Sequence, residues 1–241
     1  MTRPSLSLVA PPVLATLLAL ALLVAPRAQG SAPPPPPTAA SARCPTGRVV
    51  LTFDDGPSAA NTPTLVSTLQ RLHVPAGFFM VGSQVAAAPA AARAVHRAGL
   101  LIGNQTYDHE RLTTLSDARI RATLRSTQRL MRATALHPSD LMRPPYGAID
   151  DRVRRVVHGL GLVPVLWDVD PHDWAGGTAR AIARRVLDAL RPHQRNIVLL
   201  HDGVANSPAS IAAVPRIVRV ARSRGYCFVG LGENGQPTAP A

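Results

Sequence analysis

Lysine is absent from this 241-residue chain, and arginine therefore supplies all 26 of its basic side chains. Aromatic residues make up only 4% of the sequence, which leaves few side chains on which nucleic-acid bases could stack. We therefore expect no nucleic-acid partner, although the formal net charge of +12 would attract an anionic polymer such as a cell wall. A compositional bias explains the arginine excess equally well, so the charge alone assigns no function.

Cysteine is also scarce, and the two that are present, Cys44 and Cys227, lie near the two ends of the region that we expect to fold. In an exported protein an even number of cysteines indicates a disulfide. We therefore predict a Cys44–Cys227 bridge. The alternative is a pair of buried free thiols.

The sequence lacks a hydrophobic run of the length that a membrane-spanning helix needs, because its apolar segment at 13–24 is short and prolines interrupt its start. With Arg3 before it and Ala28-Gln29-Gly30 after it, this segment is typical of a secretory signal peptide that covers residues 1–30. We expect a secreted, extracellular protein that can associate with a cell wall. An uncleaved membrane anchor is the alternative, and it would be the only contact with a membrane.

Composition divides the remainder of the chain into three parts. Residues 31–43 contain five consecutive prolines and are predicted to form a stiff linker. Residues 44–234 are long enough for one domain with a full core, and residues 235–241 are predicted to be a disordered tail. The sequence says little about quaternary structure, and we expect a monomer.

Strand-like and helix-like segments alternate along residues 44–234, which is typical of an α/β domain with a parallel sheet. We predict a single distorted (β/α) barrel of about seven parallel strands, with the first and last strands side by side. Glycines at 99, 161 and 225 each end a helix just before a strand, and Thr62-Pro63 opens the first helix with a capping hydroxyl. The expected strands are Val49–Phe53, Gly77–Val81, Leu100–Gly103, Leu141–Arg143, Val163–Asp168, Ile197–Leu200 and Tyr226–Val229, and the expected helices are Pro63–Leu72, Gln84–Arg97, Asp117–Ala135, Asp150–His158, Ala179–Leu190 and Ile211–Arg224.

Polar clusters follow five of the expected strands, at 54–55, 104–109, 143–147, 170–174 and 201–202. In α/β barrels the carboxyl ends of the strands meet at one rim, and this rim carries the chemistry. We therefore predict an active site there. In contrast, the arginine-rich segment from Arg119 to Arg132 is predicted to be one solvated face of a helix, with apolar residues on its other face.

Four of these clusters resemble motifs of the polysaccharide deacetylases, the proteins of carbohydrate esterase family 4 with a NodB homology domain. The resemblance is carried, in the family's order, by TFDDGP at 52–57, RPPYG at 143–147, DPHDW at 170–174 and LLHD at 199–202. These motifs span nearly the whole expected domain, and the family's distorted (β/α) barrel agrees with the alternation of strands and helices.

The resemblance implies a catalytic role for four residues. Asp54 would be the general base and His201 the general acid, and these two groups would serve opposite ends of one hydrolysis. Arg143 would hold Asp54 and keep its carboxylate ionised, because a nearby positive charge favours the charged form. Asp173 would tether Arg143.

The resemblance also implies a substrate-binding set. The backbone N–H of Tyr146 would stabilise the oxyanion, while Trp174 and Leu199 would shape the groove and the pocket for the acetyl methyl group. A divalent cation, zinc above all and cobalt or nickel as alternatives, would polarise the acetyl carbonyl.

The metal ligands are the point at which this sequence departs from the family. The family supplies an aspartate and two histidines four residues apart, and here Asp55 and His109 are present but Gln105 occupies the first histidine position. Gln105 would ligate through its amide oxygen, which is a weaker ligand for zinc than imidazole. Two alternatives are that His172 completes the ligand set, or that the site holds metal poorly and the protein is a binder or a weak enzyme.

The predicted function is removal of N-acetyl groups from a polysaccharide that contains N-acetylglucosamine, either peptidoglycan or a chitin-type chain. Acetylxylan esterase activity and a non-catalytic glycan- or wall-binding role are the alternatives. A glycosidase with paired carboxylates is disfavoured, because Asp54 and Asp55 are adjacent in sequence and no other rim carboxylate lacks a role.

Overall fold

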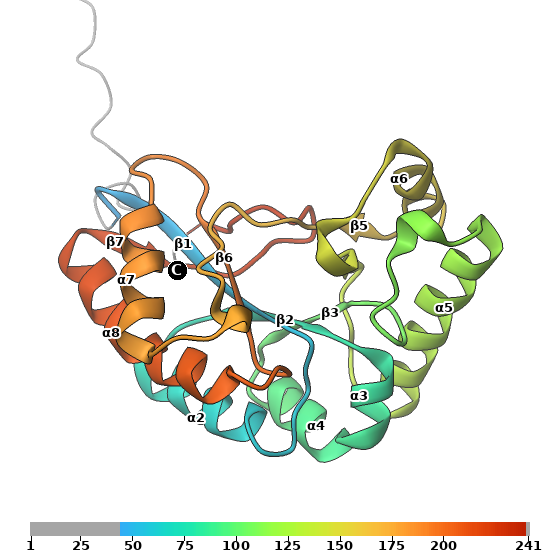
Figure 1. The fold of residues 1–241 in the computed structure, drawn as a ribbon, viewed down its shortest axis with the longest axis horizontal. Helices are drawn as coiled ribbons and strands as arrows, with labels where there is room; N and C mark the ends of the chain where they lie inside the picture. The colour runs from blue at the N-terminus through green and yellow to red at the C-terminus, as the bar shows by residue number, and fades with distance from the viewer. Residues whose placement is uncertain (1–43, 240–241) are drawn as a thin grey trace, which may run out of the picture. The chain divides into compact units, whose positions relative to one another are not determined.

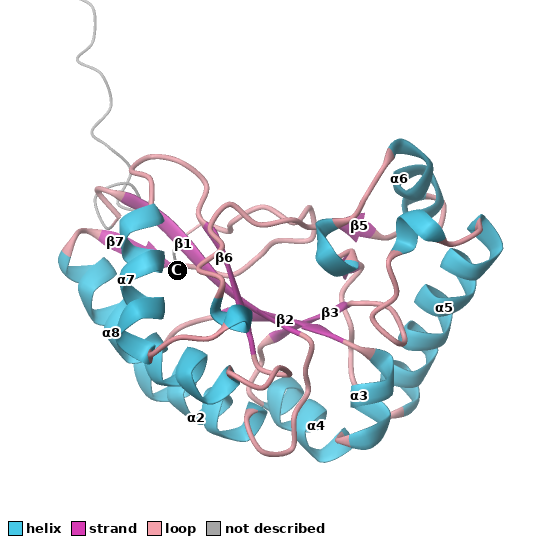
Figure 2. Cartoon of the chain, in the orientation of Figure 1, coloured by secondary structure: helices cyan, strands magenta, loops and turns pink. Residues whose placement is uncertain are grey.

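The computed structural model describes residues 44–239, which form one α/β domain of parallel strands with helices around them (Figures 1 and 2). The predicted signal peptide and linker lie outside the described residues. The strands are β1 (Gly47–Asp54), β2 (Ala76–Met80), β3 (Leu101–Asn104), β4 (Leu141–Met142), β5 (Val163–Pro164), β6 (Ile197–His201) and β7 (Tyr226–Phe228). The helices are α2 (Thr62–Leu72), α3 (Gly82–Ala87), α4 (Pro89–Arg97), α5 (Asp117–Ala133), α6 (Asp151–His158), α7 (Ala179–Ala189) and α8 (Ser207–Ser223), with short 3-10 turns η1 (Leu112–Thr114), η2 (Pro145–Gly147) and η3 (Asp173–Ala175).

The sheet is a half-barrel in the order β5-β4-β3-β2-β1-β6, with β7 paired to the start of β1. All of these strand pairs are parallel. Gly47 faces Tyr226 in the β1–β7 pair, so the prediction that the first and last strands are neighbours is confirmed. A single bridge between Val169 and Val198 brings the segment after β5 back to β6, and this bridge, rather than a full strand, completes the curve of the barrel.

The residues of β1 alternate between the two faces of the sheet, as a strand requires. Val49, Leu51 and Phe53 belong to the large apolar core between the sheet and helices α2, α4, α7 and α8, which line its outer side (Figure 1). Val50 belongs to a second apolar cluster on the inner side of the curved sheet. Asp54 lies four residues after Val50 and therefore on the same face of β1, so its carboxylate points to the inner side.

Three local predictions differ from the structure. The expected helix Gln84–Arg97 is two helices, α3 and α4, because Pro89 disfavours helical backbone at Ala88, which has φ −130° and ψ 56°. The expected strand Val163–Asp168 pairs only over its first two residues. Finally, Thr62 does not act as the helix N-cap. Its hydroxyl accepts a hydrogen bond from the Ser58 backbone N–H instead.

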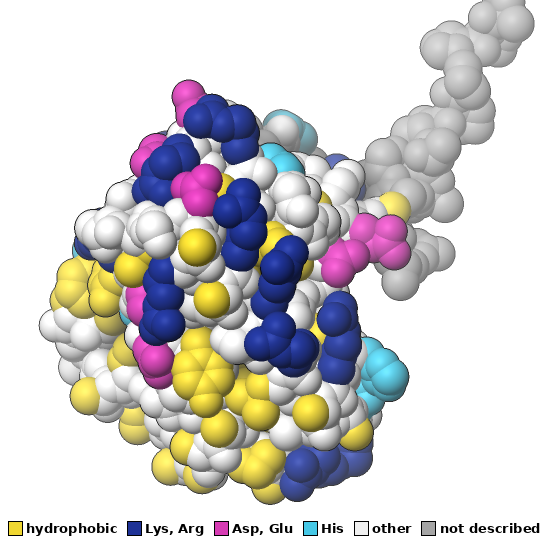
Figure 3. All heavy atoms as spheres, turned by 90° about the vertical axis from the view of Figure 1, so that its right-hand side faces the viewer, with side chains coloured by type: hydrophobic (Ala, Val, Ile, Leu, Met, Phe, Trp, Pro, Cys, Tyr) yellow, Lys and Arg dark blue, Asp and Glu magenta, His cyan; other side chains and the backbone are white. Residues whose placement is uncertain are grey.

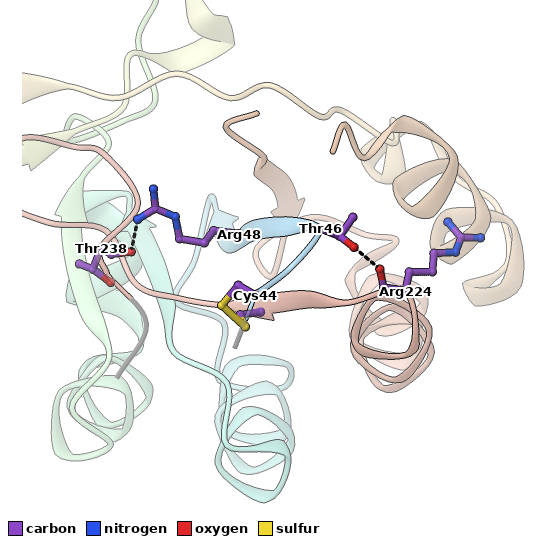
Figure 4. The surroundings of a disulfide bond; sticks show 6 residues. Cys44, Thr46, Arg48, Arg224 and Thr238 are labelled. Carbon is purple, nitrogen blue, oxygen red and sulfur yellow. Dashed lines mark hydrogen bonds between the residues drawn. A yellow bond between two sulfur atoms is a disulfide. The ribbon is translucent and has the colours of Figure 1, made fainter. Parts of the chain in front are cut away.

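The predicted disulfide between Cys44 and Cys227 is present, with a Cα–Cα distance of 5.2 Å (Figure 4). Hydrogen bonds from Thr46 Oγ1 to the Arg224 carbonyl and from Arg48 Nη1 to the Thr238 carbonyl also hold this end of the domain together. The second of these bonds, with the bridge between Leu231 and Pro237, shows that the chain is folded as far as Thr238. For residues 235–238 the prediction of a disordered tail is therefore wrong, because their backbone finds partners on 230–232 and on the Arg48 side chain of β1; residues 240–241 lie outside the described residues.

The arginine-rich segment lies on α5 as predicted, with Ile120 and Leu124 buried against the domain and Arg125, Arg129 and Arg132 exposed. Figure 3 shows dark blue basic side chains running down this face of the molecule. Among residues 44–239, none of the helices combines the length and the apolar character needed to cross a membrane.

Candidate active site

The carboxyl ends of β1, β3 and β6 meet at one rim of the half-barrel, as the sequence predicts. Asp54 and His201 are register partners at the ends of the neighbouring strands β1 and β6. Both side chains line a cleft of about 540 Å³. The full lining is Asp54, Asp55, Gln105, His109, Tyr146, Trp167, Asp170, Trp174, Leu199, His201 and Val204.

Eight of the ten predicted catalytic, metal and substrate residues line this cleft. The other two, Arg143 and Asp173, are fully buried behind it and contact Asp54 and His201. Trp167, Asp170 and Val204 were not predicted. Asp170 lies within a predicted rim cluster, whereas Trp167 was assigned to the interior of an expected strand that in fact ends at Pro164.

Arg143 holds the Asp54 carboxylate from the inner side of the barrel. Its Nη1 donates to Asp54 Oδ1 at 2.7 Å and to Thr52 Oγ1 at 2.8 Å, and its Nε donates to a backbone carbonyl at 3.2 Å. The Arg143 guanidinium also lies over the Phe79 ring, 4.1 Å from the ring centroid. This buried set of contacts leaves the carboxylate one orientation, with Oδ2 toward the cleft.

We expected the positive charge of Arg143 to control the pKa of Asp54, but burial has the larger effect. Burial raises the pKa of Asp54 to about 6, and the opposing charge of Arg143 with that of His201 offsets this effect only in part. A carboxylate with this pKa is mostly ionised at neutral pH and is a stronger base than an exposed aspartate.

Asp173 holds His201 rather than Arg143, and the predicted tether is therefore wrong. Asp173 Oδ1 lies 2.8 Å from His201 Nδ1, and Oδ2 accepts hydrogen bonds from the His201 backbone N–H at 3.0 Å and from Ser210 Oγ at 2.5 Å. The reason is the position of η3, which lies against α8 and β6 on the His201 side of the site. Asn206 Nδ2 fixes this turn by donating to the Asp173 carbonyl at 2.8 Å.

The contact with Asp173 determines the charge state of His201. Burial alone would lower the pKa of His201, but the hydrogen bond and the charge of Asp173, together with the charges of Asp54 and Asp55, raise it to about 9. The imidazole is therefore protonated at neutral pH. Because Nδ1 faces Asp173, Nε2 is the nitrogen left to the cleft.

Two of the three predicted metal ligands face each other. Asp55 Oδ1 lies 3.1 Å from His109 Nε2 and has no other hydrogen-bond partner among the described residues. Two ligands of one tetrahedral cation with bonds of about 2 Å would lie about 3.3 Å apart. Burial would raise the Asp55 pKa, but the hydrogen bond and charge of His109 lower it, which favours the ionised form that a cation needs.

Gln105 has other partners. Its Oε1 accepts a hydrogen bond from the Asp55 backbone N–H at 2.7 Å, and its Nε2 donates to Asp54 Oδ2 at 2.9 Å. His172, the alternative third ligand, is exposed and does not line the cleft. In the described part of the chain there is accordingly no cluster of three or more His, Cys, Asp or Glu residues that suits a metal ion. Asp55 and His109 fit a divalent cation as two ligands, whereas both polar atoms of the Gln105 amide already have protein partners.

The rim above these residues is formed by two exposed aromatic side chains. Tyr146 is 60% exposed and Trp174 is 53% exposed, which is unusual for side chains of this size. Tyr146 contacts the His109 ring edge to face, with the ring centroids 4.7 Å apart, and the Arg111 guanidinium lies over the Tyr146 ring, 4.5 Å from its centroid. Leu199 is buried lower in the cleft. The cleft thus has a polar floor, an apolar wall and an aromatic rim.

Comparison with known proteins agrees with this geometry. The polysaccharide deacetylase family model matches residues 42–165. The peptidoglycan-N-acetylglucosamine deacetylase PgdA of Listeria monocytogenes is 33% identical over 186 residues, which are 77% of this chain and 38% of that protein. The chain therefore spans well under half of the length of this relative.

Two solved structures have the same fold. A family 4 carbohydrate esterase from Streptomyces lividans in complex with acetate is 33% identical, with a TM-score of 0.73 over 81% of this chain and 98% of that one. A family 4 pseudoenzyme from Bacillus anthracis is 26% identical, with a TM-score of 0.68 over 76% of this chain and 63% of that one. The match of the family model over half of the chain, the motifs at the rim and these structures together show that this chain belongs to the polysaccharide deacetylase family.

Proposed function

We propose that this protein is a hydrolase that removes acetyl groups from a polysaccharide containing N-acetylglucosamine. The observation that carries the proposal is the pair formed by Asp54 and His201, a base and an acid on neighbouring strand ends at the floor of one cleft. Hydrolysis of an amide needs both, because a water molecule must lose a proton and the departing amine must gain one.

Asp54 is the general base in this proposal. Arg143 and Gln105 hold one carboxylate oxygen each, so the side chain is oriented before substrate binds. Asp54 takes a proton from a water molecule as that water attacks the acetyl carbonyl carbon. A pKa of about 6 suits this task at neutral pH, because the group is ionised and still basic.

His201 is the general acid. Asp173 keeps the imidazole protonated and orients it, and Nε2 then gives its proton to the amine nitrogen as the carbon–nitrogen bond breaks. The backbone N–H of Tyr146 makes no hydrogen bond within residues 44–239, so it is free to donate to the oxyanion. A divalent cation bound by Asp55 and His109 would supply positive charge beside the acetyl carbonyl.

The substrate class is inferred from the rim and from the relatives. Tyr146 and Trp174 present exposed aromatic surface on which sugar rings can pack, and Leu199 gives an apolar surface for an acetyl methyl group. The Listeria relative is named for its action on N-acetylglucosamine in peptidoglycan. We therefore place peptidoglycan or a chitin-type chain first and acetylated xylan second.

Acetate release tests this proposal. The wild-type protein and an Asp54→Asn variant are incubated with N-acetylglucosamine oligomers, peptidoglycan and acetylxylan, with and without added zinc or cobalt. We expect release from at least one N-acetylated substrate and a loss of about 100-fold or more in the variant. Equal release by the two proteins on every substrate would refute the proposal.

A second candidate is a non-catalytic glycan-binding protein, which the partners of Gln105 favour. One structural relative is described as a pseudoenzyme of this family. This alternative predicts retention on insoluble peptidoglycan or chitin that survives chelation and is the same for wild type and Asp54→Asn. Retention without acetate release would support it over the hydrolase.

We also propose that the protein is exported. The support is the signal-like composition of residues 1–30 and the Cys44–Cys227 disulfide, because disulfides persist in oxidising compartments. Expression of the full chain with a C-terminal tag, followed by N-terminal sequencing of the protein in the medium, tests this point. A protein found only inside the cell with its N-terminus intact would contradict it.

A further inference from the structure

Gln105 is held between the carboxylate of Asp54 and the backbone N–H of Asp55. It follows β3 directly, and its backbone N–H donates to the Met80 carbonyl at 3.0 Å at the end of β2. From there its side chain reaches to the end of β1, where it contacts both Asp54 and the backbone of Asp55. Gln105 is only 2% exposed, so water cannot easily replace these contacts.

The two neighbours determine which way the amide of Gln105 faces. The Asp55 backbone N–H can only donate a hydrogen bond, so it must meet the amide oxygen. The ionised Asp54 carboxylate can only accept one, so it must meet the amide nitrogen. The reverse orientation would place two donors against each other and two acceptors against each other. The bond to Asp54 is buried and the bond from the Asp55 N–H is partly buried, so this orientation is strongly preferred.

This arrangement has two consequences for the site. The first is that the amide oxygen, which is the only side-chain atom of Gln105 able to ligate a cation, already uses one of its two lone pairs to accept from the Asp55 N–H. The second is that Oδ2 of Asp54 has a donor that does not depend on a cation. In contrast, Asp55 Oδ1 and His109 Nε2 face only each other, at 3.1 Å, within the part of the chain that the structure describes.

We propose that Gln105 is a positioning residue that clamps Asp54 and the Asp55 backbone, and that Asp55 and His109 are the only side chains among residues 44–239 that bind a divalent cation here. The site is then a weak cation site in which the general base is already oriented in the metal-free protein. The inference rests on the proposed function only for the role of Asp54, and the binding of metal can be measured without any substrate.

Metal affinity separates a clamp from a ligand. Zinc binding to the chelator-treated protein is measured by competition with a chromophoric chelator, for the wild type, Gln105→Ala, His109→Ala and Gln105→His. If Gln105 is a clamp, Gln105→Ala loses about 10-fold at most, as for other residues that orient a metal site, whereas His109→Ala, which removes one of two ligands, loses about 100-fold or more. Gln105→His supplies an imidazole, which suits zinc, and should bind about 10-fold more tightly than the wild type or better. His172→Ala is the control variant for the alternative ligand and should leave the affinity unchanged.

A second measurement detects the clamp itself. In the presence of a chelator, Gln105→Ala should lower the melting temperature by several degrees, because one buried and one partly buried hydrogen bond are lost without a cation being involved. His109→Ala should have a smaller effect under the same conditions. Comparison with the wild type in the same buffer shows whether each variant is folded.

The proposal is overturned by a loss of zinc affinity in Gln105→Ala as large as that in His109→Ala, because Gln105 would then be a ligand. An unchanged melting temperature in metal-free Gln105→Ala, or no gain of affinity in Gln105→His, would overturn it as well. The two proposals fail separately. If the affinities follow the predicted order but no acetate is released, the clamp stands and the hydrolase does not.

Discussion

Substitution of Asp173 by asparagine should lower the rate of acetate release at alkaline pH and change it little at acidic pH. Asp173 accepts three hydrogen bonds, two of them from His201, and its charge is a main reason why the His201 pKa is about 9. Asparagine has nearly the same shape but no charge. When its oxygen faces Ser210 and the His201 backbone N–H, its NH₂ group faces Nδ1 and stabilises the neutral imidazole. The His201 pKa should therefore fall toward the ordinary value of about 6.5.

The size of the effect follows from the two pKa values. At pH 8 about nine tenths of an imidazole with a pKa of 9 is protonated, compared with about 3% when the pKa is 6.5. If His201 must be protonated to act as the general acid, kcat should fall by about 30-fold at pH 8 in Asp173→Asn. At pH 6 both forms are mostly protonated, and the loss from this cause should be less than about 2-fold.

The assay is the rate of acetate release from an N-acetylglucosamine oligomer between pH 5.5 and 9, with the His201 titration followed by NMR in parallel. Ser210→Ala is the matched control, because it removes one hydrogen bond from Asp173 but keeps the charge, and its pH profile should stay close to that of the wild type. A loss in Asp173→Asn that is equal at all pH values, or an unchanged His201 titration, would refute the reasoning.

The same pair should make stability depend on pH. The folded pKa of His201 lies above its unfolded value of about 6.5, so the folded state binds the extra proton. The stabilisation by this pair is therefore complete below about pH 6.5 and is lost as the pH rises through about 9. In Asp173→Asn the free energy of unfolding, measured with urea, should change less over this range than in the wild type.

Three further variants test other parts of the structure. Arg143→Lys should lower the free energy of unfolding by about 2–4 kcal/mol and abolish most activity, because lysine cannot reproduce the buried bonds made by Nε and Nη1; an unchanged urea midpoint would contradict this. Joint replacement of Cys44 and Cys227 by serine opens a loop with a sequence separation of 183 and should lower the free energy of unfolding by up to about 5 kcal/mol without changing kcat at low temperature; a wild-type denaturation curve would count against it. Trp174→Ala, at an exposed rim position, should raise KM for an oligosaccharide by about 3- to 10-fold and leave the melting temperature unchanged, and a change in stability instead would assign this side chain to the core.

The alternation of strands and helices, and the helix ends that precede strands, could be predicted because they depend on local sequence. The buried strands are continuous apolar runs, which is what strands covered on both faces require. Gly99, Gly161 and Gly225 adopt positive φ values of 69°, 74° and 82°, as a helix end before a strand predicts. The extent of β5 could not be predicted in this way. Its apolar run continues past Pro164, but the backbone leaves β4 there and turns to meet β6 at Val169.

The location of the site was also predictable, whereas the partners of its side chains were not. Asp54 and His201 follow strands, and parallel pairing brings strand ends together whatever the side chains are. Asp173 lies in a short turn, and its partner depends on how α8 and β6 lie against that turn. No local pattern in the sequence contains this information. The resemblance to the family also predicted the wrong partner for Asp173, namely Arg143 instead of His201.

Gln105 shows most clearly why a position in a motif predicts where a residue lies better than what it does. Its place is set by the end of β3, and any residue there would point toward the end of β1. Its role is set by the Asp55 N–H and the Asp54 carboxylate, which need an acceptor and a donor side by side, and an amide offers both. A histidine at this position could not accept from the Asp55 N–H and bind a cation at the same time, because a neutral imidazole has only one free lone pair. A histidine here would therefore have to give up the bond from the Asp55 N–H in order to ligate a cation, whereas the glutamine of this sequence makes both clamp contacts.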